Sequence, residues 1–139
     1  MSPSSLIRTL RFRASHHYRR IEWTEGENRR VFGPYLEPHE HEFVVEVQVG
    51  GPRDGETGFV VELEALDALL ERVLAPLRGS DLNQAIPDAR EGRMLPSTES
   101  LARWLFQALR DGIPPPARLE RVRVAESDSL ASEYRESPP

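Results

Sequence analysis

Two histidines separated by one residue open the most regular β-strand pattern of the chain. His39 and His41 precede a run in which apolar and polar residues alternate as far as Gln48. Because successive side chains of a strand point to opposite faces, both imidazoles are expected on one face and Glu40 on the other. Two imidazoles at the end of a strand can bind a metal ion from one side. The chemistry of this pair therefore depends on a third ligand.

The third ligand is expected at the end of the preceding strand. Residues 6–15 alternate between apolar and polar side chains, and His16 follows in phase with the apolar ones. Strands that are adjacent in the sequence commonly pair, which would bring His16 beside His39 and His41. Three neutral imidazoles with an open fourth position are typical of a catalytic zinc site. The alternative is that these are surface histidines at strand ends.

Two segments have the apolar spacing of a helix with one buried face. The first covers residues 64–75, and Pro76 stops it. The second begins after Pro96, where Ser97 or Thr98 can cap the first turn. The other expected segments are strands at about 39–49, 118–125 and 130–134, and loops at 19–37 and 77–96.

The order of these elements is strand, strand, helix, helix, strand, strand. It predicts an α+β fold, in which a four-stranded antiparallel sheet carries both helices on one face. The other face of the sheet would carry four charged residues, namely Glu42, Glu46, Arg121 and Arg123. A polar sheet face of this kind can be solvated, or it can line the inside of an oligomeric barrel.

The composition excludes several classes of protein. The 139 residues fit a single domain, with residues 1–4 and 135–139 expected to be disordered. A net charge of −5 does not favour non-specific binding to nucleic acid. The lack of cysteine removes disulfides, thiolate ligands and thiol nucleophiles. No apolar run approaches the ~18 residues of a membrane helix, and no signal peptide is visible, so we expect a cytoplasmic protein with no membrane partner.

Several short motifs occur in an order that resembles the 6-pyruvoyltetrahydropterin synthase and 6-carboxytetrahydropterin synthase family. They are Phe12-x-Ala14-x-His16, Glu27-Asn28-x-x-x-Phe32-Gly33, His39-x-His41, Thr57-Gly58, Leu82-Asn83, Ser97-Thr98-Glu99 and Val124-x-Glu126. The first and third are the specific ones, and the match covers roughly residues 7–134. The resemblance implies the tunnelling fold (T-fold). It also implies a homotrimer or homohexamer whose sheets join into a barrel, with active sites at subunit contacts.

The same resemblance implies a Zn²⁺ ion, a pterin substrate and a set of site residues. The zinc ligands would be His16, His39 and His41. Glu126 would anchor the amino-pyrimidine edge of the pterin, helped by Thr98 and Glu99. A carboxylate suits this task because the edge offers two parallel N–H donors.

Two parts of the family pattern are missing from this chain. The family has a catalytic cysteine four residues before the first histidine of the pair, where this chain has Tyr35. The family's Asp-His couple is replaced by Arg78-Gly79. A group that transfers protons is still needed, since it contributes ~10²–10⁴-fold to a rate. Glu37 is a candidate base and Tyr35 a candidate acid. The alternative for Glu37 is a solvated acid on a loop, and the alternative for Tyr35 is a side chain that packs within the loop.

Three functions remain open at this point. The first is a zinc-dependent pterin lyase that acts on dihydroneopterin triphosphate or a related pterin. The second is a non-catalytic relative that binds a pterin or a purine-like ring. The third is an oligomeric structural protein in which the metal only fixes the strand ends. Metal content separates the third function from the others, and turnover of the pterin separates the first from the second.

Overall fold

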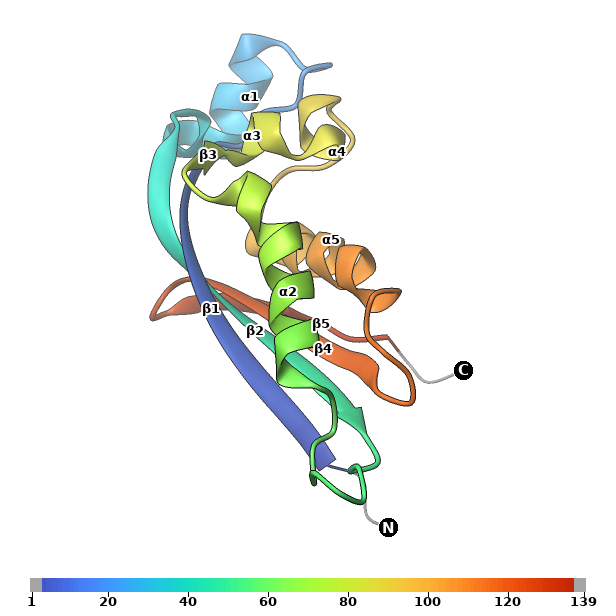
Figure 1. Cartoon of the computed structure of the whole chain (residues 1–139). Coiled ribbons are helices and arrows are strands. Elements are labelled where there is room, and N and C mark those ends of the chain that lie inside the picture. The colour runs from blue at the N-terminus through green and yellow to red at the C-terminus, as the bar shows by residue number, and fades with distance from the viewer. Residues whose placement is uncertain (1–3, 137–139) are drawn as a thin grey trace.

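The computed structural model describes residues 4–136, which form a five-stranded sheet with its helices on one side (Figure 1). The strands are β1 (Ser4–His16), β2 (His39–Gly51), β3 (Ser80–Asp81), β4 (Arg118–Ser127) and β5 (Leu130–Tyr134). Their order in the sheet is β3-β1-β2-β4-β5. The four long strands pair antiparallel as predicted, and the additional two-residue strand β3 pairs parallel to the end of β1.

Two long helices, α2 (Leu63–Leu74) and α5 (Thr98–Arg110), cover the same face of the sheet, which confirms the predicted α+β layer (Figure 1). The side chain of Ser97 caps α5 by accepting a hydrogen bond from the Ser100 N–H at 3.2 Å. Between the two helices lie the 3₁₀ turn η2 (Ala75–Leu77) and two single-turn helices, α3 (Leu82–Ala85) and α4 (Pro87–Arg90). Short elements therefore occupy part of the segment 77–96 that we expected to be a loop.

The prediction of a loop at residues 19–37 is wrong. This segment contains the helix α1 (Glu25–Phe32) and the 3₁₀ turn η1 (Gly33–Leu36). Thr24 caps α1 by accepting a hydrogen bond from the Glu27 N–H at 3.1 Å. The sequence lacks an apolar stripe here because the only buried residue of α1 is Asn28.

The core lies between the sheet and the two long helices. It includes Phe43, Val45, Val47, Val122 and Val124 from the strands and Leu66, Leu70, Leu101 and Leu105 from the helices. Arg8 interrupts the apolar alternation of β1 on the helix-facing side. Its guanidinium donates two hydrogen bonds of 2.8 Å to the carboxylate of Asp67 on α2, so the charge is paired where the strand meets the helix.

The opposite face of the sheet carries the predicted charged residues. Glu46 accepts hydrogen bonds from Arg123 at 3.1 Å and Arg121 at 3.4 Å, and Arg121 is only 6% exposed. Within residues 4–136 the sheet does not close on itself, because β5 and the first ten residues of β1 have one edge without a strand partner. A barrel of the kind implied by the resemblance would need other copies of the chain.

The structure describes three of the terminal residues that were expected to be disordered, namely residues 4, 135 and 136. Ser4 pairs with Gly51 at the start of β1, so the strand begins inside the segment 1–4. Near the other end, Glu136 forms an ion pair of 2.6 Å with Arg110. Residues 1–3 and 137–139 lie outside the described residues. No helix of the described chain has the length and the hydropathy needed to cross a membrane.

Candidate metal centre

The pairing of β1 with β2 brings three histidines together at one end of the sheet. His16 lies opposite His39 in the register, and His41 follows two residues later on the same face. The ring centroids are 4.5 Å apart for His16 and His39, 5.1 Å for His16 and His41, and 5.0 Å for His39 and His41. Glu126 reaches the same place from β4. One ligand atom from each of these four residues lies within 4.8 Å of the others, so the group could hold a metal ion.

Backbone carbonyls fix the orientation of two of the imidazoles. The Nδ1–H of His16 donates to the carbonyl of Pro96 at 2.7 Å, and the Nδ1–H of His39 donates to the carbonyl of Glu37 at 3.0 Å. A histidine whose Nδ1 is bonded in this way presents the lone pair of Nε2, which is how metal-binding imidazoles are usually oriented. The arrangement therefore fixes both the tautomer and the ring direction.

The Nε2 atoms of the site have the surroundings expected of metal ligands. The Nε2 atoms of His16 and His41 are buried and have no hydrogen-bond partner among residues 4–136. Glu126 Oε2 lies 2.9 Å from Nε2 of His41 and 3.9 Å from Nε2 of His16, but neither contact has hydrogen-bond geometry. Buried polar atoms rarely lack a partner. Three imidazole nitrogens and one carboxylate are a ligand set that suits Zn²⁺.

Burial keeps the central imidazole in the form that binds metal. His16 is fully buried, and this desolvation lowers its pKa to about 4, against a smaller opposing effect from the Pro96 carbonyl. The neighbouring imidazoles of His39 and His41 lower the pKa further. His16 is therefore neutral near pH 7, and a metal ion need not displace a proton from it.

Tyr18 is a residue of the site that our sequence analysis missed. It lies two residues after His16 and its ring centroid is 5.2 Å from that of His16. Burial raises the pKa of Tyr18 to about 12, and the carboxylates of Glu126 and Glu99 raise it further. The hydroxyl consequently keeps its proton and can donate a hydrogen bond. The signal in the sequence was its spacing, since the two-residue period of β1 continues through Tyr18.

Two buried asparagines hold the backbone around Tyr18. Asn83 accepts from the His17 N–H at 3.0 Å and donates to the His17 carbonyl at 2.9 Å. Asn28, which is 1% exposed, accepts from the Arg20 N–H at 2.8 Å and donates to the Arg20 carbonyl at 3.0 Å. Each side-chain amide thus satisfies a donor and an acceptor of an irregular segment that has no strand partner.

Comparison with known proteins shows the family of the chain. The family model for 6-pyruvoyl tetrahydropterin synthase matches residues 5–137. The chain belongs to the 6-pyruvoyl tetrahydropterin synthase family. A 6-pyruvoyl tetrahydrobiopterin synthase from Poecilia reticulata is 29% identical over 133 residues, covering 94% of this chain and 88% of the relative. A dihydroneopterin monophosphate aldolase from Pyrococcus furiosus is 25% identical over 128 residues, covering 92% of this chain and 94% of the relative.

A solved member of the family shares the whole fold. The structure of the Caenorhabditis elegans 6-pyruvoyl tetrahydropterin synthase superposes with a TM-score of 0.90 at 23% sequence identity. The alignment covers 99% of this chain and 98% of the C. elegans chain. This likeness confirms the predicted T-fold for the chain.

The residues that the family resemblance assigns to the pterin lie at the start of α5 and near the end of β4. Thr98 is buried, its hydroxyl lies 2.7 Å from that of Ser132, and it donates to Glu99 Oε1 at 3.0 Å. The backbone N–H of Glu99 and the Thr98 hydroxyl lower the pKa of Glu99, so this carboxylate stays charged. The side chain of Glu126 is 11% exposed.

The two candidates for proton transfer lie shortly before β2, Tyr35 within η1 and Glu37 directly after it. Tyr35 is 56% exposed and its ring centroid is 6.1 Å from that of His39. Glu37 is exposed. It contacts the site through its backbone carbonyl, which accepts the hydrogen bond from His39. Neither side chain belongs to the group that could hold a metal. Their roles stay predictions.

Arg78 and Gly79, which replace the family's Asp-His couple, have a structural role in this chain. Arg78 donates hydrogen bonds of 3.0 Å to both oxygens of Glu71 on α2, and it donates to the carbonyl of Arg11 on β1 at 2.8 Å. The next residue, Gly79, has a φ of +69°, a conformation that favours glycine. Arg78 thus links α2 to β1 through hydrogen bonds.

Proposed function

We propose that the protein is a zinc-dependent lyase that acts on a phosphorylated dihydropterin such as dihydroneopterin triphosphate. The observation that carries the proposal is the convergence of His16, His39 and His41, two of them with an unpaired Nε2, beside the buried carboxylate of Glu126. Catalytic zinc sites commonly have three protein ligands and keep the fourth position for water or substrate. The three imidazoles would fill the protein positions.

In this proposal Glu126 binds the substrate and leaves the metal to the histidines. A carboxylate that accepts two parallel N–H donors fixes a planar guanidine-like edge in one orientation. Glu126 is nearly buried and lies within 4 Å of two imidazole nitrogens. A pterin held there would place its side chain next to the metal. Thr98 and Glu99 would support the ring from the start of α5.

When bound, zinc polarises oxygens of the substrate side chain and so makes neighbouring C–H and O–H groups more acidic. The chain must still move the protons. Glu37 is the proposed base, because it lies on the segment that leads directly into His39, and Tyr35 is the proposed acid. Tyr18, whose raised pKa keeps it protonated, can donate a hydrogen bond to an oxygen of the bound side chain.

The comparisons support two lyase reactions on such a substrate. One relative is named for a synthase and another for an aldolase that acts on dihydroneopterin monophosphate. Elimination would release inorganic triphosphate from dihydroneopterin triphosphate, whereas aldol cleavage of the side chain would release a phosphorylated two-carbon aldehyde. Both reactions need the same metal site, and they differ in which bond breaks.

We also propose that the chain forms a homotrimer or homohexamer. The open edges of β1 and β5 support this, because unpaired edges of a sheet are usually covered or paired. The charged face of Glu46, Arg121 and Arg123 would then line the inside of the ring of sheets.

Incubation of the zinc-loaded protein with dihydroneopterin triphosphate, followed by separation of the products, tests the function. We expect a new pterin and one of the two phosphorylated fragments. Glu126→Gln should abolish pterin binding in a titration while zinc content stays at the wild-type level. Glu133→Gln, which changes an acid on the opposite face of the sheet, should behave as wild type. Wild-type pterin affinity in Glu126→Gln would refute the assignment.

A further inference from the structure

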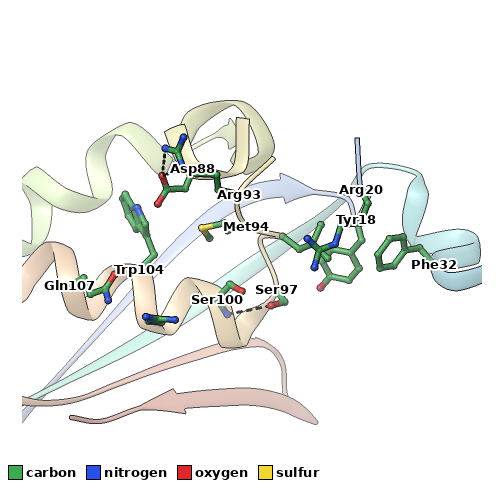
Figure 2. Close-up of a pocket in the computed structure, with 12 residues that line it drawn as sticks. Tyr18, Arg20, Phe32, Asp88, Arg93, Met94, Ser97, Ser100, Trp104 and Gln107 are labelled. Carbon is green, nitrogen blue, oxygen red and sulfur yellow. Dashed lines mark hydrogen bonds and ion pairs between the residues drawn. The ribbon is translucent and has the colours of Figure 1, made fainter. Parts of the chain in front are cut away.

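A hollow of about 560 Å³ lies beside the metal centre and is not explained by the metal site or by the pterin anchor. Figure 2 shows Tyr18 and Phe32 on one side of it, Trp104 and Gln107 on the other, and Met94 between them. Its volume is within the range of ~300–1,000 Å³ that is typical of small-molecule sites. We call this cavity the arginine hollow, because Arg20, Arg93 and Arg103 contribute to its wall.

The arginine hollow and the metal centre share a wall. Tyr18 lines the hollow, and its ring also packs against His16 of the metal centre. Ser97 lines the hollow next to Pro96, whose carbonyl accepts the hydrogen bond from His16. The hollow therefore adjoins the metal centre at Tyr18, whose ring lies between His16 and the hollow.

The hollow presents an excess of positive charge. Three arginines and a single acid, Asp88, line it, which gives a net charge of +2. Arg93 donates to Asp88 at 3.1 Å and also pairs with Glu91, so these charges largely cancel. Arg103 has no carboxylate within ion-pair distance among residues 4–136, and the nearest carboxylate oxygen to Arg20 is 3.9 Å away on Glu22. Arg20 and Arg103 are therefore the cations available to a ligand.

The backbone of Arg20 is held in place before any ligand arrives. Its backbone N–H and carbonyl are both bonded to the buried amide of Asn28, and Phe32, at the end of the same helix, stacks on Trp23 at a centroid distance of 5.8 Å. Arg103 projects from α5, a helix of 13 residues anchored in the core. The backbones of both arginines are thus held in place, and only their side chains must be ordered when an anion binds.

We infer that the arginine hollow binds the phosphate groups of the substrate, with Arg20 and Arg103 as the contacting residues. The inference rests on the proposed function for the identity of the substrate, and it extends that function to a second subsite. The pterin would lie at Glu126, the reacting carbons at the metal, and the phosphorylated end beyond Tyr18. Guanidinium groups suit this task because they donate two parallel hydrogen bonds to phosphate oxygens.

Binding of inorganic tripolyphosphate, measured by calorimetry on the full chain, tests the inference without any need for catalysis. We expect binding that weakens as salt is added. Arg20→Ala and Arg103→Ala should each weaken it roughly tenfold, as expected for the loss of a hydrogen bond to a charged group. The matched control is Arg72→Ala, an exposed arginine on α2 that does not line the hollow. It should bind tripolyphosphate like the wild type.

A second measurement separates this inference from the proposed function. The arginine variants should lose affinity for dihydroneopterin triphosphate and keep wild-type affinity for unphosphorylated dihydroneopterin. If the protein binds tripolyphosphate through Arg20 and Arg103 but turns over no pterin, the anion site stands and the proposed function fails. If wild-type turnover persists in both variants and their tripolyphosphate affinity equals that of Arg72→Ala, the inference is overturned and the proposed function survives.

Discussion

The imidazole of His16, at the end of β1, donates a hydrogen bond of 2.7 Å to the carbonyl of Pro96, the residue before the cap of α5. This contact joins the sheet to the start of the helix that carries Thr98 and Glu99. It also determines which nitrogen of His16 faces the other imidazoles. The metal centre and the proposed pterin site are therefore positioned by the same hydrogen bond.

The buried His16 should make the metal-free protein less stable in acid. Its pKa is lowered to about 4 in the folded chain and is near 6.5 when unfolded, so between these values the unfolded chain binds more protons. The stabilisation is complete above pH 6.5 and is lost as the pH falls toward 4. At pH 5 the loss should be about 2 kcal/mol. Urea unfolding with a chelator present, at pH 7 and pH 5, measures it. His16→Gln should lack this part of the pH dependence, and an equal loss in both proteins would contradict the account.

His39→Ala should lower the zinc content sharply, because it removes one of three imidazoles from the centre. The matched control is His17→Ala. His17 is next to His16 in the sequence but is outside the group that could hold a metal. Metal analysis after dialysis should give a wild-type zinc content for His17→Ala and a strongly reduced one for His39→Ala. Full occupancy in His39→Ala would mean that the ligand set is wrong.

Glu37→Gln tests the proposed base with little change to the structure. The variant keeps the backbone carbonyl that accepts the hydrogen bond of His39 and removes only the charge of the side chain. We expect kcat to fall by about 10²–10⁴-fold with zinc content unchanged. Glu40→Gln is the control, because Glu40 lies on the other side of His39 in the sequence and forms an ion pair of 3.1 Å with Arg13. Equal kcat values for the two variants would remove Glu37 from the mechanism.

Asn83→Ala should destabilise the protein by about 2 kcal/mol, since it leaves the N–H and the carbonyl of His17 without their partner. Gln84→Ala, at the exposed neighbouring position, should change the free energy of unfolding by less than about 0.5 kcal/mol. Chemical denaturation of both variants gives the comparison. Similar stabilities for the two would show that the amide of Asn83 does not hold this segment.

The parts of the fold that follow a strong period could be predicted from the sequence. The alternation through Phe43, Val45 and Val47 gave β2, and the spacing of Leu101 and Leu105 gave α5. The pairing of β1 and β2 could be predicted because adjacent strands commonly pair, and it placed His16 opposite His39.

The parts that could not be predicted depend on polar contacts between distant segments. Helix α1 has no apolar stripe, because it is anchored through Asn28 to the backbone of Arg20. Strand β3 is too short for any period and exists through its pairing with β1. Tyr18 could not be assigned to the site from the sequence, because it lies beyond the last apolar residue of β1, although the two-residue period of the strand continues to it. The arginine hollow is formed by three segments that no local pattern relates.

X-ray absorption spectroscopy of the zinc-loaded protein tests directly whether His16, His39 and His41 bind the metal. We expect one zinc ion per chain with three imidazole nitrogens at ~2.0–2.1 Å and one further oxygen ligand. If His41→Ala still binds zinc, its spectrum should show weaker imidazole scattering than that of the wild type. A wild-type spectrum without imidazole scattering, or with oxygen ligands alone, would rule out the three histidines as the zinc ligands.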